Sequence, residues 1–237
     1  YIRIKASARG GQKLFDNTGR SMEILRSDKN SVAVYKESGI PSQPDKSGQT
    51  DMTALLKAEI GGEIYCVHRL DTPTAGVMVY ARSSRAAGML SAALAADDSC
   101  KLYMAAVSGA PETDSGEMHD LLWHDRHMNK SFCVSSPRAS AKPAFLEHRT
   151  LAKTDDSSLV LIKLHTGRTH QIRVQFASRK MPLFGDGKYG SRQKGALGLC
   201  CVRLCWKDPF SGKNIDICRL PQSPWNGFDI TPDMLCF

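Results

Sequence analysis

Residues 64–81 read IYCVHRLDTPTAGVMVYA, and this stretch decides how the chain folds around one acidic side chain. The apolar residues on either side predict two strands, 64–70 and 77–81, and the residues 72–76 between them predict a turn. Asp71 therefore stands where a strand gives way to a turn. A partly buried carboxylate at such a place is costly unless other groups hold it. A partner for Asp71 is expected from another part of the chain.

Short strands and a few helices alternate on both sides of this stretch. The β-branched run SVAVY at 31–35 predicts a strand, and Thr50 or Asp51 can cap a helix that continues to residue 58 before Gly61 and Gly62. Further helices are predicted at 83–96 and 169–180. Further strands are predicted at 101–109, 121–124, 131–134, 144–151, 158–164, 197–206 and 214–220, and the rest of 111–142 is expected to be irregular. This alternation indicates a mixed α/β or α+β fold.

The composition is typical of a globular domain that binds a polyanion. The 237 residues, 41% of them hydrophobic, suffice for one large core. We expect a single domain of catalytic size at 29–237, preceded by a polar, basic extension at 1–28. Because clustered Lys and Arg attract phosphates, the net charge of +8 favours a nucleic-acid partner, although many basic proteins bind none.

The eight cysteines do not form a recognisable disulfide or metal framework. Most lie in apolar runs such as LGLCCVRLCW, where a reduced thiol behaves as a small hydrophobe. Because no C-x-x-C pair occurs and Cys200, Cys201 and Cys205 have no second cluster at zinc-finger spacing, we expect no metal and a reducing, cytoplasmic environment. We also expect no membrane segment, since no stretch approaches roughly 18 uncharged residues.

A second stretch, LHTGRTHQIRVQFASRKMPLFGDGKYG at 164–190, also sets charged residues against apolar neighbours. Its TGR triplet predicts a turn, after which His170 and Arg173 open a largely apolar helix. In the first stretch, Arg69 and Asp71 lie two residues apart, on one face if the strand persists. By charge spacing alone, structural ion pairs are the better interpretation of both stretches.

The two stretches together resemble the signatures of a known family. HRLDTPTAG resembles the H-R-L-D-x-x-x-x-G motif of the RluA-type RNA pseudouridine synthases, and HTGRTHQIRVQ followed by PLFGDGKYG resembles their second motif. ILRSDKNSVAVYKESGIPSQP, KLYMAAVSG and LGLCCVRLCWKDP resemble the opening segment, the K-x-Y-x-A-x-V-x-G strand and the closing Leu-rich strand of the family. The resemblance covers roughly residues 24–222 in consistent order. The chain departs from the usual Lys-Pro-x-Gly of the opening segment, since it has Lys36-Glu37-Ser38-Gly39.

The resemblance implies both a fold and a reaction. The fold is α+β, with a mixed, largely antiparallel sheet in two halves, flanking helices and the active cleft between the halves. The reaction is the isomerisation of uridine to pseudouridine in ribosomal or transfer RNA, without a cofactor: the C1′–N1 bond breaks, and C5 bonds to C1′. The partner is RNA, bound by a monomer. Since residues 1–28 are too short for the N-terminal RNA-binding domain of the larger members, the catalytic body is expected to capture the RNA.

The resemblance also implies roles for individual residues. Asp71 matches the catalytic carboxylate, acting as nucleophile at C1′ or as base at C2′, and Arg173 matches the arginine that keeps it ionised and oriented. Tyr103 matches the tyrosine that stacks on the target base and is a candidate to remove the C5 proton. Arg69 matches the residue that enters the helical stack where the uridine leaves it. Candidate phosphate contacts are Arg168, Arg179, Lys180 and Lys188.

Two other functions fit the same residues. A non-catalytic RNA-binding protein on this scaffold would bind RNA in a salt-dependent manner without modifying uridine. A hydrolase of a glycosidic bond would need a second carboxylate within about 10 Å of Asp71, for which Asp186 is the candidate. His68, His165 and His170 are expected to orient backbone or neighbouring side chains rather than to transfer protons.

Overall fold

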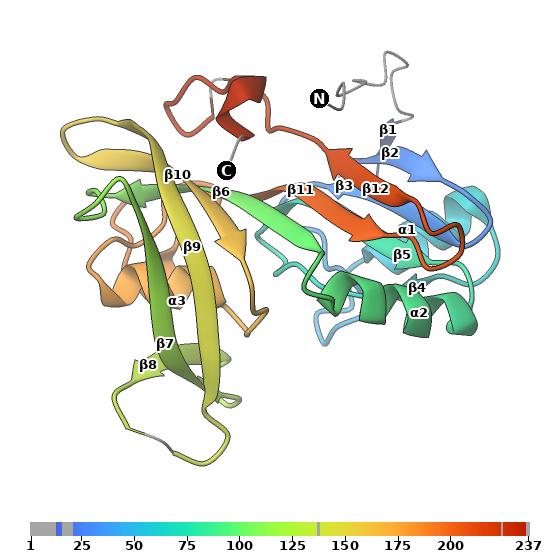
Figure 1. The fold of residues 1–237 in the computed structure, drawn as a ribbon, viewed down its shortest axis with the longest axis horizontal. Helices are drawn as coiled ribbons and strands as arrows, with labels where there is room; N and C mark the ends of the chain where they lie inside the picture. Colours follow the sequence, from blue (N-terminus) through green and yellow to red (C-terminus); the bar gives the residue numbers. More distant parts are fainter. Residues whose placement is uncertain (1–12, 16–20, 137, 224, 236–237) are drawn as a thin grey trace.

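One sheet runs through the whole body of the protein (Figure 1). This computed structural model describes residues 13–15, 21–136, 138–223 and 225–235. The strands are β1 (Lys13–Phe15), β2 (Ser21–Ser27), β3 (Ser31–Lys36), β4 (Tyr65–Cys66), β5 (Ala75–Ala81), β6 (Cys100–Ser108), β7 (Ser115–Asp125), β8 (Lys130–Val134), β9 (Lys142–Lys153), β10 (Ser157–Leu164), β11 (Leu199–Lys207) and β12 (Asn214–Cys218). The helices are α1 (Met52–Ile60), α2 (Ser84–Ala95) and α3 (Gln171–Ser178), with short 3-10 turns η1 (Gly187–Tyr189) and η2 (Pro232–Leu235).

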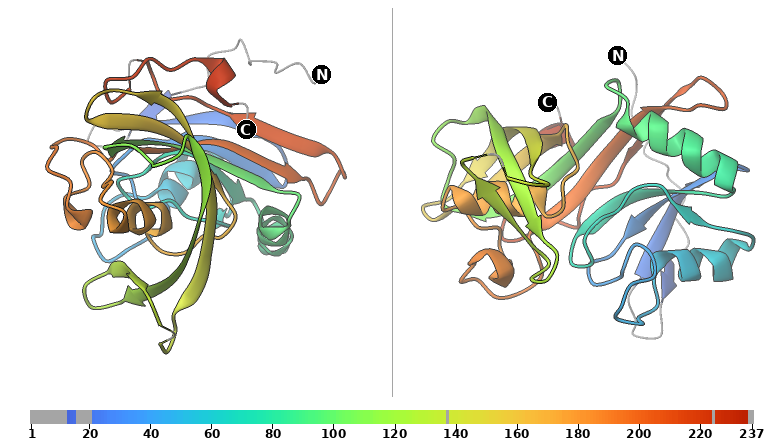
Figure 2. Two further views of the ribbon diagram at one scale, coloured as in Figure 1. Left: turned by 60° about the vertical axis from the view of Figure 1, so that its left-hand side comes forward. Right: turned by 90° about the horizontal axis from the view of Figure 1, so that it is seen from below.

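The strand order divides the sheet into two halves. The main path is β1-β2-β3-β5-β11-β6-β10-β9-β7-β8, with β4 beside β5 and β12 beside β11. Among the pairs of the described strands, only β11 with β5 is parallel. The antiparallel pair of β11 and β6, here called the seam, joins the halves, which Figure 2 shows as two bodies of strands and helices. The predicted mixed, largely antiparallel sheet in two halves is confirmed.

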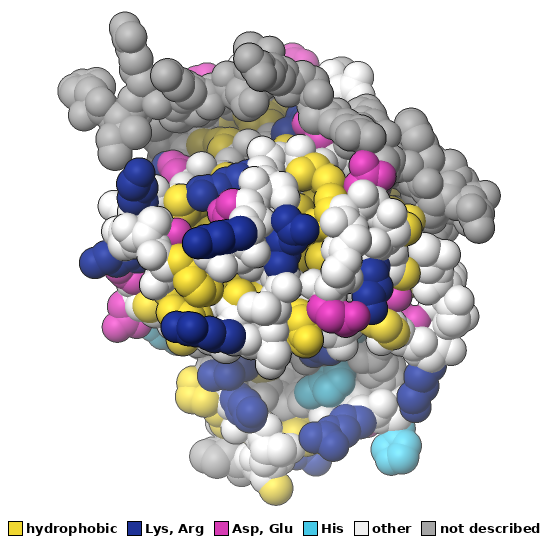
Figure 3. All heavy atoms as spheres, turned by 90° about the vertical axis from the view of Figure 1, so that its right-hand side faces the viewer, with side chains coloured by type: hydrophobic (Ala, Val, Ile, Leu, Met, Phe, Trp, Pro, Cys, Tyr) yellow, Lys and Arg dark blue, Asp and Glu magenta, His cyan; other side chains and the backbone are white. Residues whose placement is uncertain are grey.

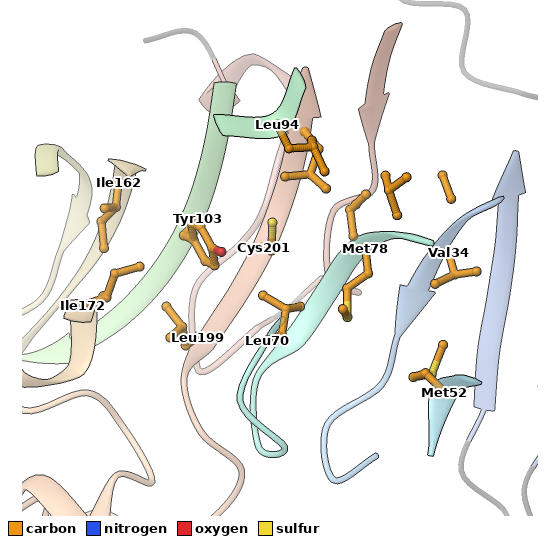
Figure 4. Packing of buried hydrophobic residues seen from close by; sticks show 14 of the residues in the cluster. Val34, Met52, Leu70, Met78, Leu94, Tyr103, Ile162, Ile172, Leu199 and Cys201 are labelled. Atoms are coloured by element: carbon orange, nitrogen blue, oxygen red, sulfur yellow. The ribbon is translucent and has the colours of Figure 1, made fainter. Parts of the chain in front are cut away.

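Apolar side chains pack on both faces of the sheet because successive strand residues point to opposite sides. On one face, Leu56 of α1, Leu90 of α2 and Phe176 of α3 join the larger core cluster. Figure 4 shows this packing close to the seam. On the other face, a smaller cluster includes Phe228 and Ile230 from the C-terminal segment. The helices and the C-terminal segment thus cover opposite faces of the same sheet.

The predicted helices are confirmed, and residues that the sequence predicts as caps lie at both ends of α1 and at the start of α2. The Asp51 carboxylate caps α1 by accepting hydrogen bonds from the backbone N–H groups of Thr53 and Ala54. Gly61, with a φ of 67°, ends α1. Ser83 caps α2 in the same way through the N–H of Ala86.

Two strand predictions were wrong in extent. The predicted strand 64–70 is a strand only over β4, because the backbone N–H and carbonyl of Leu70 both bond the Ser42 hydroxyl instead of a neighbouring strand. The strand predicted at 121–124 is the end of β7, a strand of 11 residues whose first part lies in the region predicted as irregular. Only Met118 and Leu122 of β7 are buried, so its sequence lacks the apolar alternation that predicts a strand.

The described part of the predicted N-terminal extension includes a strand of the sheet. β2 pairs with β3, and Met22 is 1% exposed within the larger core cluster. The proposed boundary after residue 28 falls in the turn between these strands, where the Asp28 carboxylate accepts hydrogen bonds from the N–H groups of Asn30 and Ser31. The folded body therefore begins before residue 29. Residues 1–12 and 16–20 lie outside the described residues.

Gly76→Ala should disrupt the contact between β5 and β11. A Cβ at Gly76 would lie 2.3 Å from the carbonyl oxygen of Cys201, and the residue has a φ of 130°. Because no side-chain rotation relieves a backbone clash, we expect the free energy of unfolding in urea to fall by about 3 kcal/mol or more. Gly88→Ala in α2, where a Cβ meets open space, is the control and should raise it by about 0.5–1 kcal/mol. A Gly76→Ala protein of unchanged stability would contradict this close approach.

Candidate active site

A cleft of about 810 Å³ lies where the two halves of the sheet meet. The turn that carries Asp71 lines it from one half, and the start of α3 lines it from the other. Tyr103 of β6 and Leu199 of β11 also line it, from the two strands of the seam. The cleft thus draws its lining from segments more than a hundred residues apart in the chain.

The turn at Asp71 is held by hydrogen bonds to the segment 36–42. The N–H of Thr74 bonds the Asp71 carbonyl at 2.9 Å and closes the turn. The N–H of Gly39 donates to the Thr72 carbonyl at 2.8 Å, and the Ser38 hydroxyl donates to the Pro73 carbonyl at 2.8 Å. These bonds fix the backbone on which the Asp71 side chain depends.

Lys36 adds a cation beneath this turn. Its side chain is fully buried, and Nζ donates to the carbonyls of Glu37, Ile40 and Thr72 at 3.1, 2.9 and 3.2 Å. Burial lowers the pKa of Lys36 to about 7, while the charge of Asp71 acts in the opposite direction. In the sequence, Lys36 was noted only as the first residue of the unusual Lys36-Glu37-Ser38-Gly39 segment. Its contacts beneath the Asp71 turn were not predicted.

Arg173 joins two carboxylates through one guanidinium. Nη1 donates to Asp71 Oδ2 at 2.9 Å, while Nε and Nη2 donate to the two oxygens of Asp186 at 2.7 and 2.8 Å. The side chains of Arg173 and Asp186 are only 7% and 1% exposed, whereas that of Asp71 is 29% exposed. Asp186 therefore anchors the guanidinium from below, and Asp71 meets it at the floor of the cleft. A planar fork suits this double contact.

The residues before α3 hold Arg173 in the first turn of the helix. His170 takes a left-handed conformation with a φ of 55°, which is uncommon outside glycine. Oε1 of Gln171 accepts hydrogen bonds from the Thr166 hydroxyl at 2.8 Å and from the N–H of Arg168 at 3.0 Å. These contacts shape the turn that the TGR triplet predicted.

A hydrogen-bonded chain links α3 to β8 and η1 behind the carboxylate. His170 Nδ1 lies 2.9 Å from the Tyr189 hydroxyl, which accepts a hydrogen bond from the N–H of Ser131 at 2.8 Å. His170 Nε2 lies 3.7 Å from Asp71 Oδ2. Burial lowers the pKa of His170 to about 4, so the ring is neutral at pH 7 and does not form an ion pair with Asp71. His170 therefore contacts Tyr189 through a neutral ring.

Tyr103 lies in an apolar wall of the cleft. Figure 4 shows its side chain at β6 with the hydroxyl directed toward Cys201, and Ile172 and Leu199 belong to the same core cluster. The residue is 7% exposed. Burial and the Cys201 thiol raise the pKa of Tyr103 well above its usual value, so the phenol stays protonated at neutral pH.

The residues predicted to contact RNA separate into two groups. Arg69, Arg168 and Lys188 line the cleft. Arg179 and Lys180 follow the end of α3 instead, and the Arg179 guanidinium is engaged by Asp120 at 2.9 Å. Positive charge also occurs outside the cleft, since Figure 3 shows Lys and Arg interleaved with acidic side chains across another face.

The other two histidines of the motifs, His68 and His165, contact groups within the fold. Nε2 of His68 accepts a hydrogen bond from the N–H of Val79 at 3.0 Å, and His165 contacts Glu147 at 2.5 Å. Within the described residues, no group of three or more His, Cys, Asp or Glu side chains is arranged to hold a metal ion. In the same part of the chain, no helix has the length and apolar character needed to cross a membrane.

Asp186 does not offer a second reactive carboxylate. Both of its oxygens are bonded by Arg173, its side chain is 1% exposed, and it is not among the residues that line the cleft. A water or a sugar could not reach it without breaking the buried ion pair. This arrangement disfavours a hydrolase that uses two carboxylates across a glycosidic bond.

Comparison with known sequences places these residues in a family context. The family described as RNA pseudouridylate synthase matches residues 30–178. The chain is 35% identical over 179 residues to "Uncharacterized RNA pseudouridine synthase YhcT" of Bacillus subtilis, covering 73% of this chain and 59% of that protein. It is 32% identical to "Ribosomal large subunit pseudouridine synthase D" of Borreliella burgdorferi, covering 73% and 56%, and 30% identical to "tRNA pseudouridine synthase C" of Pectobacterium carotovorum, covering 87% and 61%.

The chain thus matches between 56% and 61% of the lengths of these three relatives. Among solved structures, "Human RNA Pseudouridylate Synthase Domain Containing 1" aligns with a TM-score of 0.70 at 21% identity, covering 84% of this chain and 83% of that one. This likeness supports the fold.

Arg173→Met should be strongly destabilising, because it leaves the buried Asp186 carboxylate without its cation. We expect the free energy of unfolding, measured in urea at pH 7, to fall by about 3–5 kcal/mol. Arg203→Met is the control, since it removes an equally well-aligned but more exposed pair with Asp216 and should cost about 1 kcal/mol or less. Equal losses for the two variants would contradict the buried bridge.

His68→Gln should reduce the loss of stability in acid. An unfolded histidine has a pKa of 6.5, and burial lowers that of His68 to about 3. Between these values only the unfolded chain binds the proton, so stability is full above pH 6.5 and falls with decreasing pH by up to about 1.4 kcal/mol per unit. Glutamine can still accept from Val79 but does not titrate. Urea unfolding between pH 6 and 4 should show a slope smaller by about 1 kcal/mol per unit, and an unchanged slope would contradict the burial of this ring.

Proposed function

We propose that this chain, which belongs to the RNA pseudouridylate synthase family, isomerises uridine to pseudouridine in RNA. In this proposal Asp71 is the catalytic carboxylate. The observation that carries this proposal is the contact between Asp71 and Arg173 at the floor of the cleft. The bridge to Asp186 fixes the direction of the guanidinium, which in turn orients the Asp71 carboxylate. One oriented carboxylate is what the reaction requires.

The geometry suggests which oxygen of Asp71 acts. Arg173 Nη1 and His170 Nε2 both approach Oδ2, at 2.9 and 3.7 Å. We therefore assign the reaction to Oδ1, either as the nucleophile at C1′ or as the base at C2′. In both routes the C1′–N1 bond breaks while the base is held, and the base turns before C5 bonds to C1′. The rearrangement stays within one nucleotide, so it needs no cofactor.

We assign base stacking to Tyr103. Its ring lies in the apolar wall that also includes Leu199, so a pyrimidine could lie against it with water excluded. The raised pKa of Tyr103 disfavours the phenolate. A neutral phenol is a weak base, so this assignment favours stacking over removal of the C5 proton by Tyr103.

We assign the RNA contacts to the basic residues at the rim. Lifting a uridine out of a stacked helix costs a few kcal/mol, which contacts around the vacated position must offset. Arg69, Arg168 and Lys188 line the cleft and can reach the nucleotides beside the target. Arg179 and Lys180 would contact RNA that extends past the end of α3.

We propose ribosomal or transfer RNA as the substrate class, since the named relatives include a ribosomal large subunit and a tRNA pseudouridine synthase. We further propose that the protein acts in the cytoplasm as a monomer.

Asp71→Asn should abolish the reaction and keep the fold, because the amide has the shape of the carboxylate without its charge. Tritium release from RNA that contains 5-tritiated uridine measures the turnover. Asp155→Asn, at an exposed position in the turn between β9 and β10, is the matched control and should release tritium at the wild-type rate. We expect Asp71→Asn to release tritium at less than about a thousandth of the wild-type rate.

Two results would contradict the assignment. Release by Asp71→Asn at the control rate would remove this carboxylate from the reaction. Wild-type protein that binds RNA in a salt-dependent manner but never releases tritium would favour the non-catalytic RNA-binding function.

A further inference from the structure

Two cysteines face each other across the seam, on the side of the sheet opposite the cleft. Cys100 at the start of β6 is the direct antiparallel partner of Cys205 in β11. Directly opposed residues in such a pair have Cα atoms about 4.5 or 5.5 Å apart. Both separations fall within the range of about 4.4–6.8 Å found in disulfides. The backbone therefore already has the spacing that a bond between these thiols requires.

Alternation along the strands separates these thiols from the reaction site. Lys101 and Tyr103 point into the cleft from β6, so Cys100, which is in phase with Leu102, points to the opposite face. Both Cys100 and Cys205 are half-buried, which leaves them accessible to a small oxidant.

The surroundings of the pair favour a reactive thiolate. Cys205 Sγ lies 3.3 Å from Asp216 Oδ1, and Arg203 holds both Asp216 oxygens at 2.9 and 2.6 Å. The Cys205 thiol, followed by the charges of Arg203 and Lys163, lowers the pKa of the Cys100 thiol, while burial and Asp216 act in the opposite direction. A lowered thiol pKa favours the thiolate, which is the form that attacks an oxidant.

Other described cysteines lack this combination. Cys200 and Cys201 lie on the same strand but are fully buried, and burial raises the pKa of both thiols, that of Cys200 to about 12. Cys133 is half-buried next to the Ser178 hydroxyl on another part of the sheet, and burial raises its pKa. Oxidation should therefore be selective for the opposed pair.

We propose that Cys100 and Cys205 are a redox-modification site, at which a peroxide closes a reversible disulfide across the seam. The Cys100 thiolate attacks a peroxide oxygen, the O–O bond breaks, and the released hydroxide takes up a proton to become water. The Cys205 sulfur then attacks the resulting sulfenic acid, the S–O bond breaks, and the hydroxide leaves with the Cys205 proton as a second water. The two thiols are oxidised by two electrons, and the peroxide is reduced. A dithiol reductant reverses the change by exchange.

This bond would tie the two halves of the sheet together behind the cleft. The seam contains a register shift between Cys201 and Arg203, so its ladder of hydrogen bonds is interrupted close to Cys205. A covalent link there restricts the unfolded chain and resists separation of β6 from β11. The oxidised protein should accordingly unfold at a higher temperature than the reduced protein.

Peptide mapping of the full chain tests the proposal. The reduced protein is treated with hydrogen peroxide at pH 7, free thiols are alkylated, and the protein is digested with trypsin without reduction. Cys100 falls in the peptide 86–101 and Cys205 in 204–207, and each peptide contains a single cysteine. We expect these two peptides to be joined, to separate with dithiothreitol, and to remain joined in the control variant Cys133→Ser.

Two single variants test the roles of Cys100 and Cys205 separately. Cys205→Ser should leave a sulfenic acid on Cys100 that dimedone labels, and Cys100→Ser should lose both the disulfide and the oxidation-dependent rise in unfolding temperature. The proposal is overturned if wild-type protein yields no joined peptide 86–101/204–207, or if Cys205 pairs mainly with Cys218 in peptide 214–219.

Discussion

The structure depends on one guanidinium that lies between two carboxylates. Arg173 is nearly buried, and a buried cation is tolerated only when its partners and hydrogen bonds compensate for the water it has lost. Asp186 supplies a bidentate contact from the interior, and Asp71 supplies the third contact from the opposite half of the sheet. The same ion pair that satisfies the arginine therefore orients the Asp71 carboxylate, on which the proposed reaction depends.

Other contacts around the cleft hold this bridge in place. The turn at Asp71 is bonded to the segment 36–42, with Lys36 buried beneath it. The left-handed His170 and its contact with Tyr189 set the start of α3, from which Arg173 projects. Tight backbone packing at Gly76 keeps β5 against β11, one of the two strands of the seam. The Cys100 and Cys205 pair lies across the seam, on the face opposite the cleft.

The sequence predicted what local signals or family motifs encode. Capping by Asp51 and the strand before Gly39 follow from short-range chemistry, and the partnership of Asp71 with Arg173 was inferred from the resemblance. Only the end of β7, at 121–124, was predicted, because most of the side chains in its first part are at least partly exposed and apolar alternation is absent there. Asp186 was considered only as a reactive acid, since its place beneath Arg173 depends on tertiary packing. Its position between two glycines of GDGKYG was the available signal of a tightly packed turn.

The most direct test of the central claim is a double-mutant cycle between Asp71 and Arg173, measured as the free energy of unfolding in urea at pH 7. The cost of Arg173→Met is determined in the wild-type and Asp71→Ala backgrounds. A formed pair predicts that this cost is smaller by about 0.5–3 kcal/mol when Asp71 is absent. Costs that agree within about 0.5 kcal/mol would show that the two residues do not interact, and would contradict the bridge on which the cleft is built.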